Sequence, residues 1–397
     1  MLEVFRVFLR LGLTSFGGPI AHLGYFRDEF VRRRGWLDEA HYAQLLAICQ
    51  FLPGPASSQL GFAIGLARAG WRGGLAAFAG FTLPSALAMF ALALSAPHWI
   101  AHPAGVALVH GLKLVAVAVV AYGVWGMARS LTPDWRRRLI AIAAGVAIAG
   151  VGGPWMQLLA VAAGGAAGLA LCRAPLLAGA DGSIPNFAPG YGRGVALACL
   201  VTFALGLGAA LLWSGGPASL AGLAAACYRA GALVFGGGHV VLPLLEQRLV
   251  ATGWLELDRF LLGYGAAQAL PGPMFALAAY VGAALPLPTP APWRALVALL
   301  ALFLPGLLLV AAALPLWSAW MRRAWAARAV AGINAAVVGL LAAALFDPIA
   351  RQAIGEARDL GIVAVAVAML AWRRLPVLAA VAWCVLAALG SAWPWPP

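Results

Sequence analysis

Two arginines stand among apolar residues at matching places in the sequence. Arg10 lies in FLRLG shortly before Gly17 and Gly18, and Arg229 lies in CYRAG shortly before Gly236. An ionised arginine in an apolar segment is costly unless it is paired or hydrated, and no acidic residue lies within one helical turn of either arginine. A guanidinium without an acid suits a tetrahedral oxyanion. The structural alternative is snorkelling of the side chain to a membrane interface.

Two Pro-Gly-Pro motifs interrupt uncharged segments, at Pro53-Gly54-Pro55 and at Pro271-Gly272-Pro273. Proline removes a backbone donor and clashes with the preceding turn, so each motif breaks a helix. The half-helix after the break directs free N–H groups and the positive end of its dipole toward the break, which favours an anion. Ser57 adds a hydroxyl at the first break, where the second has Met274 and Phe275. The alternative is a kink that serves packing.

The remaining candidates share the same spacing between two halves of the chain. Glycines that expose amides or allow close packing are Gly17, Gly18, Gly236, Gly237 and Gly238. Gln50 and Gln268 are neutral donors. Lys113 is a second cation, and Asn334 is its counterpart. His22 and His239 could carry a coupled proton. Each has a structural alternative, namely a hydrogen bond across the helix break, snorkelling, or a satisfied polar histidine.

Several chemistries have no motif in this sequence. Acidic residues stand only at the edges of apolar runs, although a cation transporter usually needs a buried acid. The five cysteines are scattered without ligand spacing, and nucleotide-binding, zinc-protease and hydrolase motifs are missing. We therefore expect no metal, no cofactor and no enzymatic activity. The net charge of +13 comes from arginines in short loops, which is typical of membrane topology and not of nucleic-acid binding.

The composition identifies the elements that must position these residues. The chain has 397 residues, of which 63% are hydrophobic and 10% charged, and its mean hydropathy is +0.92. Soluble domains have about 45–50% apolar and about 25% charged residues, so soluble, disordered, collagen-like and disulfide-scaffold classes are excluded. Unbroken apolar runs also exclude an outer-membrane barrel. The sequence predicts an all-α polytopic membrane protein.

Short motifs recur in the same order along the chain, which indicates a duplication. The matching pairs are Gly35-Trp36-Leu37 with Gly253-Trp254-Leu255, QFLPGP from Gln50 with QALPGP from Gln268, Phe81-Thr-Leu-Pro84 with Phe303-Leu-Pro305, and His110-Gly-Leu-Lys113 with Ala331-Gly-Ile-Asn334. We assign residues 1–175 to the first repeat, 176–219 to a linker and 220–397 to the second repeat. An apolar run at about 195–213 within the linker belongs to neither repeat and predicts one additional transmembrane helix.

An odd helix between two repeats inverts the second repeat, and the arginines support this topology. Loop 129–138 carries four arginines, whereas its counterpart 347–360 is mixed in charge. Two further loop pairs alternate in the same way, which predicts inverted repeats of the kind found in secondary transporters. If every segment spans, residues 27–34 fall outside despite their arginines. Re-entrant or broken helices around the glycine and PGP motifs return these residues to the cytoplasm, and we prefer this arrangement.

The segment LGLTSFGGPIAHLGYFRDEFVRRRGWLDEAHYAQLLAICQFLPGPASSQL and the segments FGGGHVVLPLL and QALPGP resemble the two halves of the chromate transporter family. The resemblance implies a multi-pass protein of the bacterial inner membrane that exports chromate, with sulfate as a related oxyanion, driven by an ion or proton gradient. Two alternatives stay open: an importer of sulfate or another oxyanion with the same fold, and a membrane-embedded enzyme. The expected partners are the oxyanion and the lipid bilayer, and a homodimer is a further option.

Overall fold

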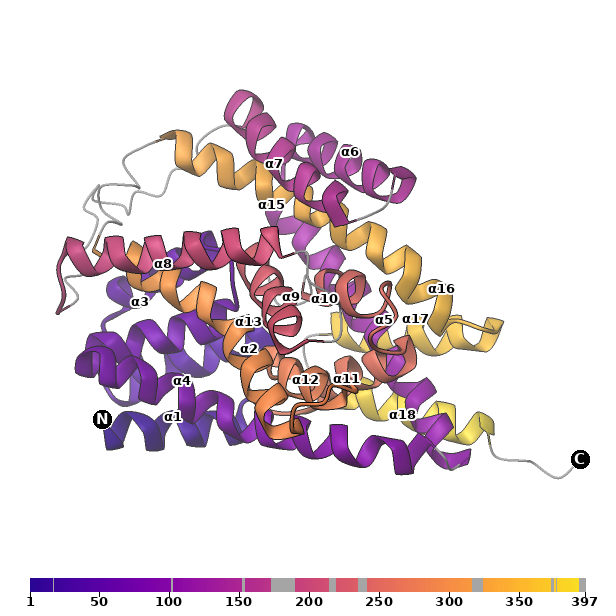
Figure 1. The fold of residues 1–397 in the computed structure, drawn as a ribbon. Coiled ribbons are helices and arrows are strands. Elements are labelled where there is room, and N and C mark those ends of the chain that lie inside the picture. The colour runs from indigo at the N-terminus through magenta and orange to yellow at the C-terminus, as the bar shows by residue number, and fades with distance from the viewer. Residues whose placement is uncertain are drawn as a thin grey trace, which may run out of the picture.

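The computed structural model describes residues 1–16, 18–100, 103–151, 154–172, 190–213, 219–234, 241–315, 324–372, 375 and 377–392. Within these ranges the chain forms helices and turns and no strand, as the composition predicts (Figure 1). Gly17, Gly236, Gly237, Gly238, His239 and most of the linker (173–189 and 214–218) lie outside the described residues.

The first repeat contains α1 to α7, with a π-helical turn between α2 and α3. The bounds are α1 Leu2–Thr14, α2 Gly18–Arg27, the π-helix Asp28–Arg33, α3 Glu39–Phe51, α4 Ala56–Ile100, α5 Pro103–Leu131, α6 Trp135–Val151 and α7 Pro154–Leu171. The linker helix α8 spans Arg193–Leu212.

The second repeat follows the same order of long and short helices. Its elements are α9 Leu220–Leu233, α10 Val241–Leu249, α11 Leu257–Ala269, a 3-10 turn Met274–Ala276, α12 Leu277–Ala284, α13 Ala291–Ala313, α15 Ala324–Ala344, a π-helix Leu345–Ala350, α16 Arg351–Ala353, α17 Ala357–Ala371 and α18 Val377–Ala392. Both PGP motifs interrupt helices, as predicted, because α3 ends at Phe51 and α11 ends at Ala269.

Among the described residues, five stretches are long and apolar enough to cross a membrane: Ala56–Ala96, Gly105–Arg129, Arg193–Leu212, Ala291–Ala313 and Ala327–Asp347. Arg193–Leu212 is the additional helix expected between the repeats. It packs against α9 and α13 and leaves large apolar side chains such as Leu205 and Leu212 exposed. A long apolar helix that is mostly exposed fits a position at the lipid boundary.

The long helix α4 consists of two arms that fold back on each other. Ala69 and Gly70 have non-helical backbone angles, and Gly65 lies directly against Gly73, because a Cβ on Gly73 would stand 2.2 Å from the Gly65 carbonyl oxygen. In the second repeat α12 and α13 are the corresponding arms, and Gly282 lies against the backbone of Arg294. The first arm after each PGP motif is therefore short.

The last two helices of each repeat pack against one helix of the other repeat, α15 or α5. The pair α6 and α7 packs on α15, and the pair α17 and α18 packs on α5. Corresponding glycines sit at both contacts: a Cβ on Gly111 of α5 would lie 2.8 Å from Val385 Cα, and one on Gly332 of α15 would lie 2.6 Å from Gly168 Cα. Contacts that match in both directions are those that a two-fold axis between similar units produces.

Candidate functional site

The first PGP break is joined to the second repeat through its glycine. Gly54 has a φ of +128°, a backbone conformation that residues with a Cβ rarely adopt. Its N–H donates to the carbonyl oxygen of Val234 over 2.7 Å, and Val234 is the residue at which α9 ends. The break thus satisfies a carbonyl that the end of a helix would otherwise leave unpaired.

The second PGP break makes the corresponding bond, from the second repeat to the first. Gly272 has a φ of +92°, and its N–H donates to the carbonyl oxygen of Ser15 over 3.0 Å. Ser15 ends α1, which corresponds to α9. The two breaks therefore form a reciprocal pair at the interface between the repeats, and each holds the end of the other repeat's first helix.

Both breaks are tightly packed against the arm that follows in the opposite repeat. A Cβ on Gly54 would lie 3.0 Å from Gly306 Cα, and a Cβ on Gly272 would lie 2.9 Å from Ser85 Oγ. Gly306 and Ser85 occupy corresponding places after Pro305 and Pro84. No side chain fits at either glycine without movement of its neighbours.

Polar side chains gather at the first break. Ser57 and Ser58 in the first turn of α4 are buried, as is Gln59. The Gln59 amide nitrogen donates to the carbonyl oxygens of Pro53 over 2.8 Å and Gly306 over 3.1 Å. The Gln59 Oε1 and Ser58 Oγ atoms are buried and have no hydrogen-bond partner. The Ser58 hydroxyl is a donor without a partner at the positive end of a helix, which suits an anion.

Gln59 was not among the sequence-predicted residues, although the polar run Ser57-Ser58-Gln59 in an uncharged segment was a signal for it. The predicted glutamines behave differently from each other. Gln268 is buried, and its amide nitrogen lies 2.6 Å from the Met274 sulfur across the second break. This contact is the structural alternative stated for it, whereas Gln50 is exposed at the end of α3.

His22 lies at the second break. Its side chain is fully buried, its Nε2 is 3.2 Å from the Ser15 carbonyl oxygen that also accepts from Gly272, and its ring packs edge-on against Phe81. The other ring nitrogen, Nδ1, is buried without a partner. His22 is thus placed where an anion at the break would find an imidazole.

The two predicted arginines occupy different environments. Arg229 is buried, and its Nη2 donates to the carbonyl oxygen of Ala210 in α8, while its Nε has no partner. Arg10 lies on an exposed position of α1, which matches the snorkelling alternative. No hydrogen bond or ion pair joins either side chain to the PGP breaks within the described residues.

Lys113, the candidate second cation, has an acidic partner. Its Nζ lies 2.5 Å from Asp258 Oδ1, an acid of the second repeat far away in sequence. One turn earlier on α5, His110 Nε2 lies 2.9 Å from Asp359 Oδ1. Asn334, which corresponds to Lys113, is half-buried and its Oδ1 has no partner. The ion pair of Lys113 and the hydrogen bond of His110 therefore tie the repeats together.

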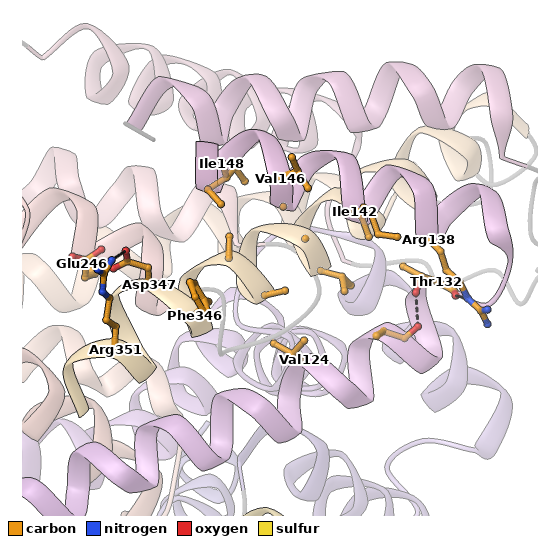
Figure 2. Close-up of a pocket in the computed structure, with 18 of the residues that line it drawn as sticks. Val124, Thr132, Arg138, Ile142, Val146, Ile148, Glu246, Phe346, Asp347 and Arg351 are labelled. Carbon is orange, nitrogen blue, oxygen red and sulfur yellow. Dashed lines mark hydrogen bonds and ion pairs between the residues drawn. The ribbon is translucent and has the colours of Figure 1, made fainter. Parts of the chain in front are cut away.

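The structure has a cavity of 1260 Å³ away from the PGP breaks. It lies between α5, α6, α15 and α10, and none of the sequence-predicted residues lines it (Figure 2). Among the described residues, no group of three or more His, Cys, Asp or Glu side chains is placed to hold a metal ion.

The two-part arrangement has a counterpart among known families. The profile of the chromate transporter family matches residues 2–169 and 221–390, which is one match to each repeat. The chain belongs to the chromate transporter family. The resemblance stated from the FGGP and PGP motifs and the expectation of a duplicated all-helical membrane protein are therefore confirmed.

Three relatives share this family. A chromate transport protein of Pseudomonas aeruginosa is 30% identical over 70% of this chain and 65% of its own length. A probable chromate transport protein of Synechococcus elongatus is 27% identical over 86% of this chain and 83% of its own. A chromate transport protein of Cupriavidus metallidurans is 26% identical over 86% and 81%. The chain thus spans just under two thirds of the Pseudomonas protein. No solved structure matches the chain.

Proposed function

We propose that this member of the chromate transporter family is a secondary transporter that exports chromate, or a closely related tetrahedral oxyanion, across the bacterial inner membrane. The observation that supports the proposal best is the reciprocal pair of bonds from Gly54 to Val234 and from Gly272 to Ser15. These bonds bring two broken helices to the interface between the repeats. Transporters of inverted repeats bind their substrates between the repeats, at half-helix ends.

The first break offers the richer anion chemistry. It combines the first-turn N–H groups of α4 with the buried hydroxyls of Ser57 and Ser58. The amide nitrogen of Gln59, which donates to the carbonyl oxygens of Pro53 and Gly306, holds the break in place. The second break contributes fewer donors, since Phe275 and Ala276 replace the serines, but adds His22 through the shared Ser15 carbonyl. In this proposal Arg229 supplies a buried positive charge that favours a dianion, and Arg10 attracts anions from the surface.

The lengths of the helices favour re-entry at the breaks. α1, α3 and α11 have 13 residues each, or about 20 Å at 1.5 Å per residue, whereas the hydrocarbon core is about 30 Å thick. Helices of this length end inside the membrane, where irregular backbone is tolerated only if it is buried in protein or lines a cavity. Together with the alternating arginines, these lengths favour two inverted repeats that expose the site alternately to each side.

The test is flux through purified protein in liposomes, with chromate inside, sulfate as competitor and a set pH gradient. We expect gradient-dependent chromate movement that sulfate reduces and that liposomes without protein do not show. Movement of sulfate in preference to chromate would favour the oxyanion importer, and inverted vesicles give the direction. If the protein transports sulfate but chromate is neither transported nor able to reduce the sulfate flux, the proposal is wrong. Chemical conversion of a lipid or of the anion would favour the membrane-embedded enzyme.

A further inference from the structure

The cavity between α5, α6 and α15 ends in a cluster of charged side chains. Glu246 of α10, Asp347 of the π-helix that follows α15 and Arg351 of α16 gather at one end. Arg138 lies at the other end, with apolar side chains such as Ile142 between them (Figure 2). Arg351 Nη1 lies 3.1 Å from Asp347 Oδ2. The cavity therefore brings two carboxylates and one guanidinium to a single place.

Glu246 differs from the other buried acids. Among the described residues the buried acids are Glu29, Glu246 and Asp359. Glu29 binds Arg33 and Arg34 at 2.8 and 2.6 Å, and Asp359 binds His110. The residue Glu246 is only 9% exposed, and its side chain makes no hydrogen bond or ion pair with any described residue. A buried carboxylate without a cation is costly in its charged form and is stabilised by a proton.

The charged groups on the neighbouring elements are engaged elsewhere. α10 packs against α9 and α11. Arg229 of α9 donates to Ala210, and Asp258 and Arg259 of α11 pair with Lys113 and Glu256. On α10 itself, Arg248 is a half-buried cation at the last turn. The other charged residues that line the cavity are Arg129, Arg138, Asp347 and Arg351. Of these, Asp347 and the Arg351 that binds it lie beside Glu246 (Figure 2).

The corresponding place in the first repeat is built differently. Asp28 matches Glu246 in the register set by the Gly-Trp-Leu motifs. Asp28 is exposed and binds Arg32 at 2.8 Å, four residues later. In the second repeat, Val250 occupies the position that corresponds to Arg32. At Glu246 the loss of the cation, the burial of the acid and the adjoining cavity occur together.

We propose that Glu246, with Asp347 beside it, is the site that binds and releases the coupling proton; this inference rests on the proposed transport function. The Glu246 carboxylate takes a proton from hydronium in the cavity, forming a carboxylic acid and water, and returns it to water when the repeats change arrangement. Asp347 opposes a second negative charge nearby and so favours the protonated acid.

The position of the cluster suits this role. α10 has nine residues and lies outside the long apolar stretches. Burial, with a smaller contribution from the Asp347 charge, raises the pKa of Glu246 to about 7. A group that titrates near neutral pH can load and unload across a modest pH gradient. In the topology with re-entrant helices, the segments after α10 and α15 both face outside, from which protons enter.

The experiment compares Glu246→Gln with Asp28→Asn in proteoliposomes, since the two acids are repeat counterparts. Two fluxes are measured: exchange of labelled chromate at equal pH on both sides, and accumulation driven by a pH gradient. We expect Glu246→Gln to keep the exchange but lose the pH-driven accumulation, and Asp28→Asn to keep both. Exchange at the wild-type rate shows that the variant is folded.

Three outcomes overturn the inference. The first is accumulation by Glu246→Gln that follows the pH gradient as in the wild type, and the second is drive by a sodium gradient in place of protons. The third is an infrared difference spectrum, recorded between acid and alkaline pH, in which the carboxylic-acid band of the wild type persists in Glu246→Gln. Failure of the proposed function has a different signature, because wild-type protein would then show no chromate exchange at all.

Discussion

The amide nitrogen of Gly54 lies 2.7 Å from the carbonyl oxygen of Val234, a residue of the other repeat. The bond connects the point where one helix restarts to the point where another helix stops. Its counterpart joins Gly272 and Ser15 over 3.0 Å. Any rocking of one repeat against the other has to move or break these bonds, so the proposed substrate site and the proposed moving interface share the same residues.

Replacement of Gly54 by alanine should abolish transport. The new methyl group would lie 3.0 Å from Gly306 Cα, at a φ of +128°, and we expect a loss of about 1–3 kcal/mol in stability. Gly24 is the matched control, because a Cβ there meets nothing within 4 Å. Thermal unfolding in detergent and chromate flux are the measurements. Wild-type flux in Gly54→Ala would contradict the role of the break.

Gln59→Leu should weaken the affinity for the oxyanion more than it lowers the maximal rate. The substitution removes the amide that bridges Pro53 and Gly306 and gives the first break the leucine that the second has at Leu277. Concentration-dependent uptake separates KM from kcat. Gln50→Leu serves as the control, since Gln50 is exposed, and an equal effect of both variants would exclude a specific role for Gln59.

The two arginines should differ strongly when each is replaced by alanine. Arg229 is buried, and its loss removes a positive charge and leaves the Ala210 carbonyl unpaired. Arg10 is exposed, so Arg10→Ala should reduce transport only at low anion concentration. Chromate resistance of cells with matched protein levels measures both. If Arg229→Ala keeps full resistance, the buried charge plays no part in transport.

Asp359→Ala should destabilise the contact between α17 and α5 by about 1–3 kcal/mol. Asp359 accepts from the backbone nitrogens of Gly355 and Glu356 at 2.9 and 3.1 Å, as well as from His110. All three donors lose their partner in the variant. Asp258→Ala is the comparison, because Asp258 is exposed and its pair with Lys113 is worth less. Chemical unfolding curves measure both, and an equal loss would be unexpected.

The elements that sequence reasoning found are those with local causes. Proline at positions 53 and 271 breaks a helix whatever surrounds it, and apolar runs of sufficient length form helices in a membrane. The motif spacing revealed the duplication because both copies kept their glycines and prolines. The neighbours of Arg10 in the sequence do not determine which face of α1 it occupies. Whether its side chain is buried or exposed could therefore not be predicted.

The features that escaped prediction depend on contacts between distant segments. Lys113 meets Asp258 only because α5 and α11 pack together, and nothing near Lys113 in the sequence indicates an acid. Gln59 bridges to Gly306 across the repeats. Glu246 looked like a loop residue at the edge of an apolar run, and its burial arises from the packing of α10.

The exchange of helix pairs between the repeats bears on how the protein is made. The helices α6 and α7 leave the ribosome before α15, against which they pack. Likewise, α5 is synthesised before α17 and α18, which pack against it. The first half therefore cannot mature on its own during synthesis. Its final assembly requires α17 and α18. A ribosome that stalls before residue 357 would therefore leave the α5 surface exposed, and quality-control proteases could recognise this incomplete protein.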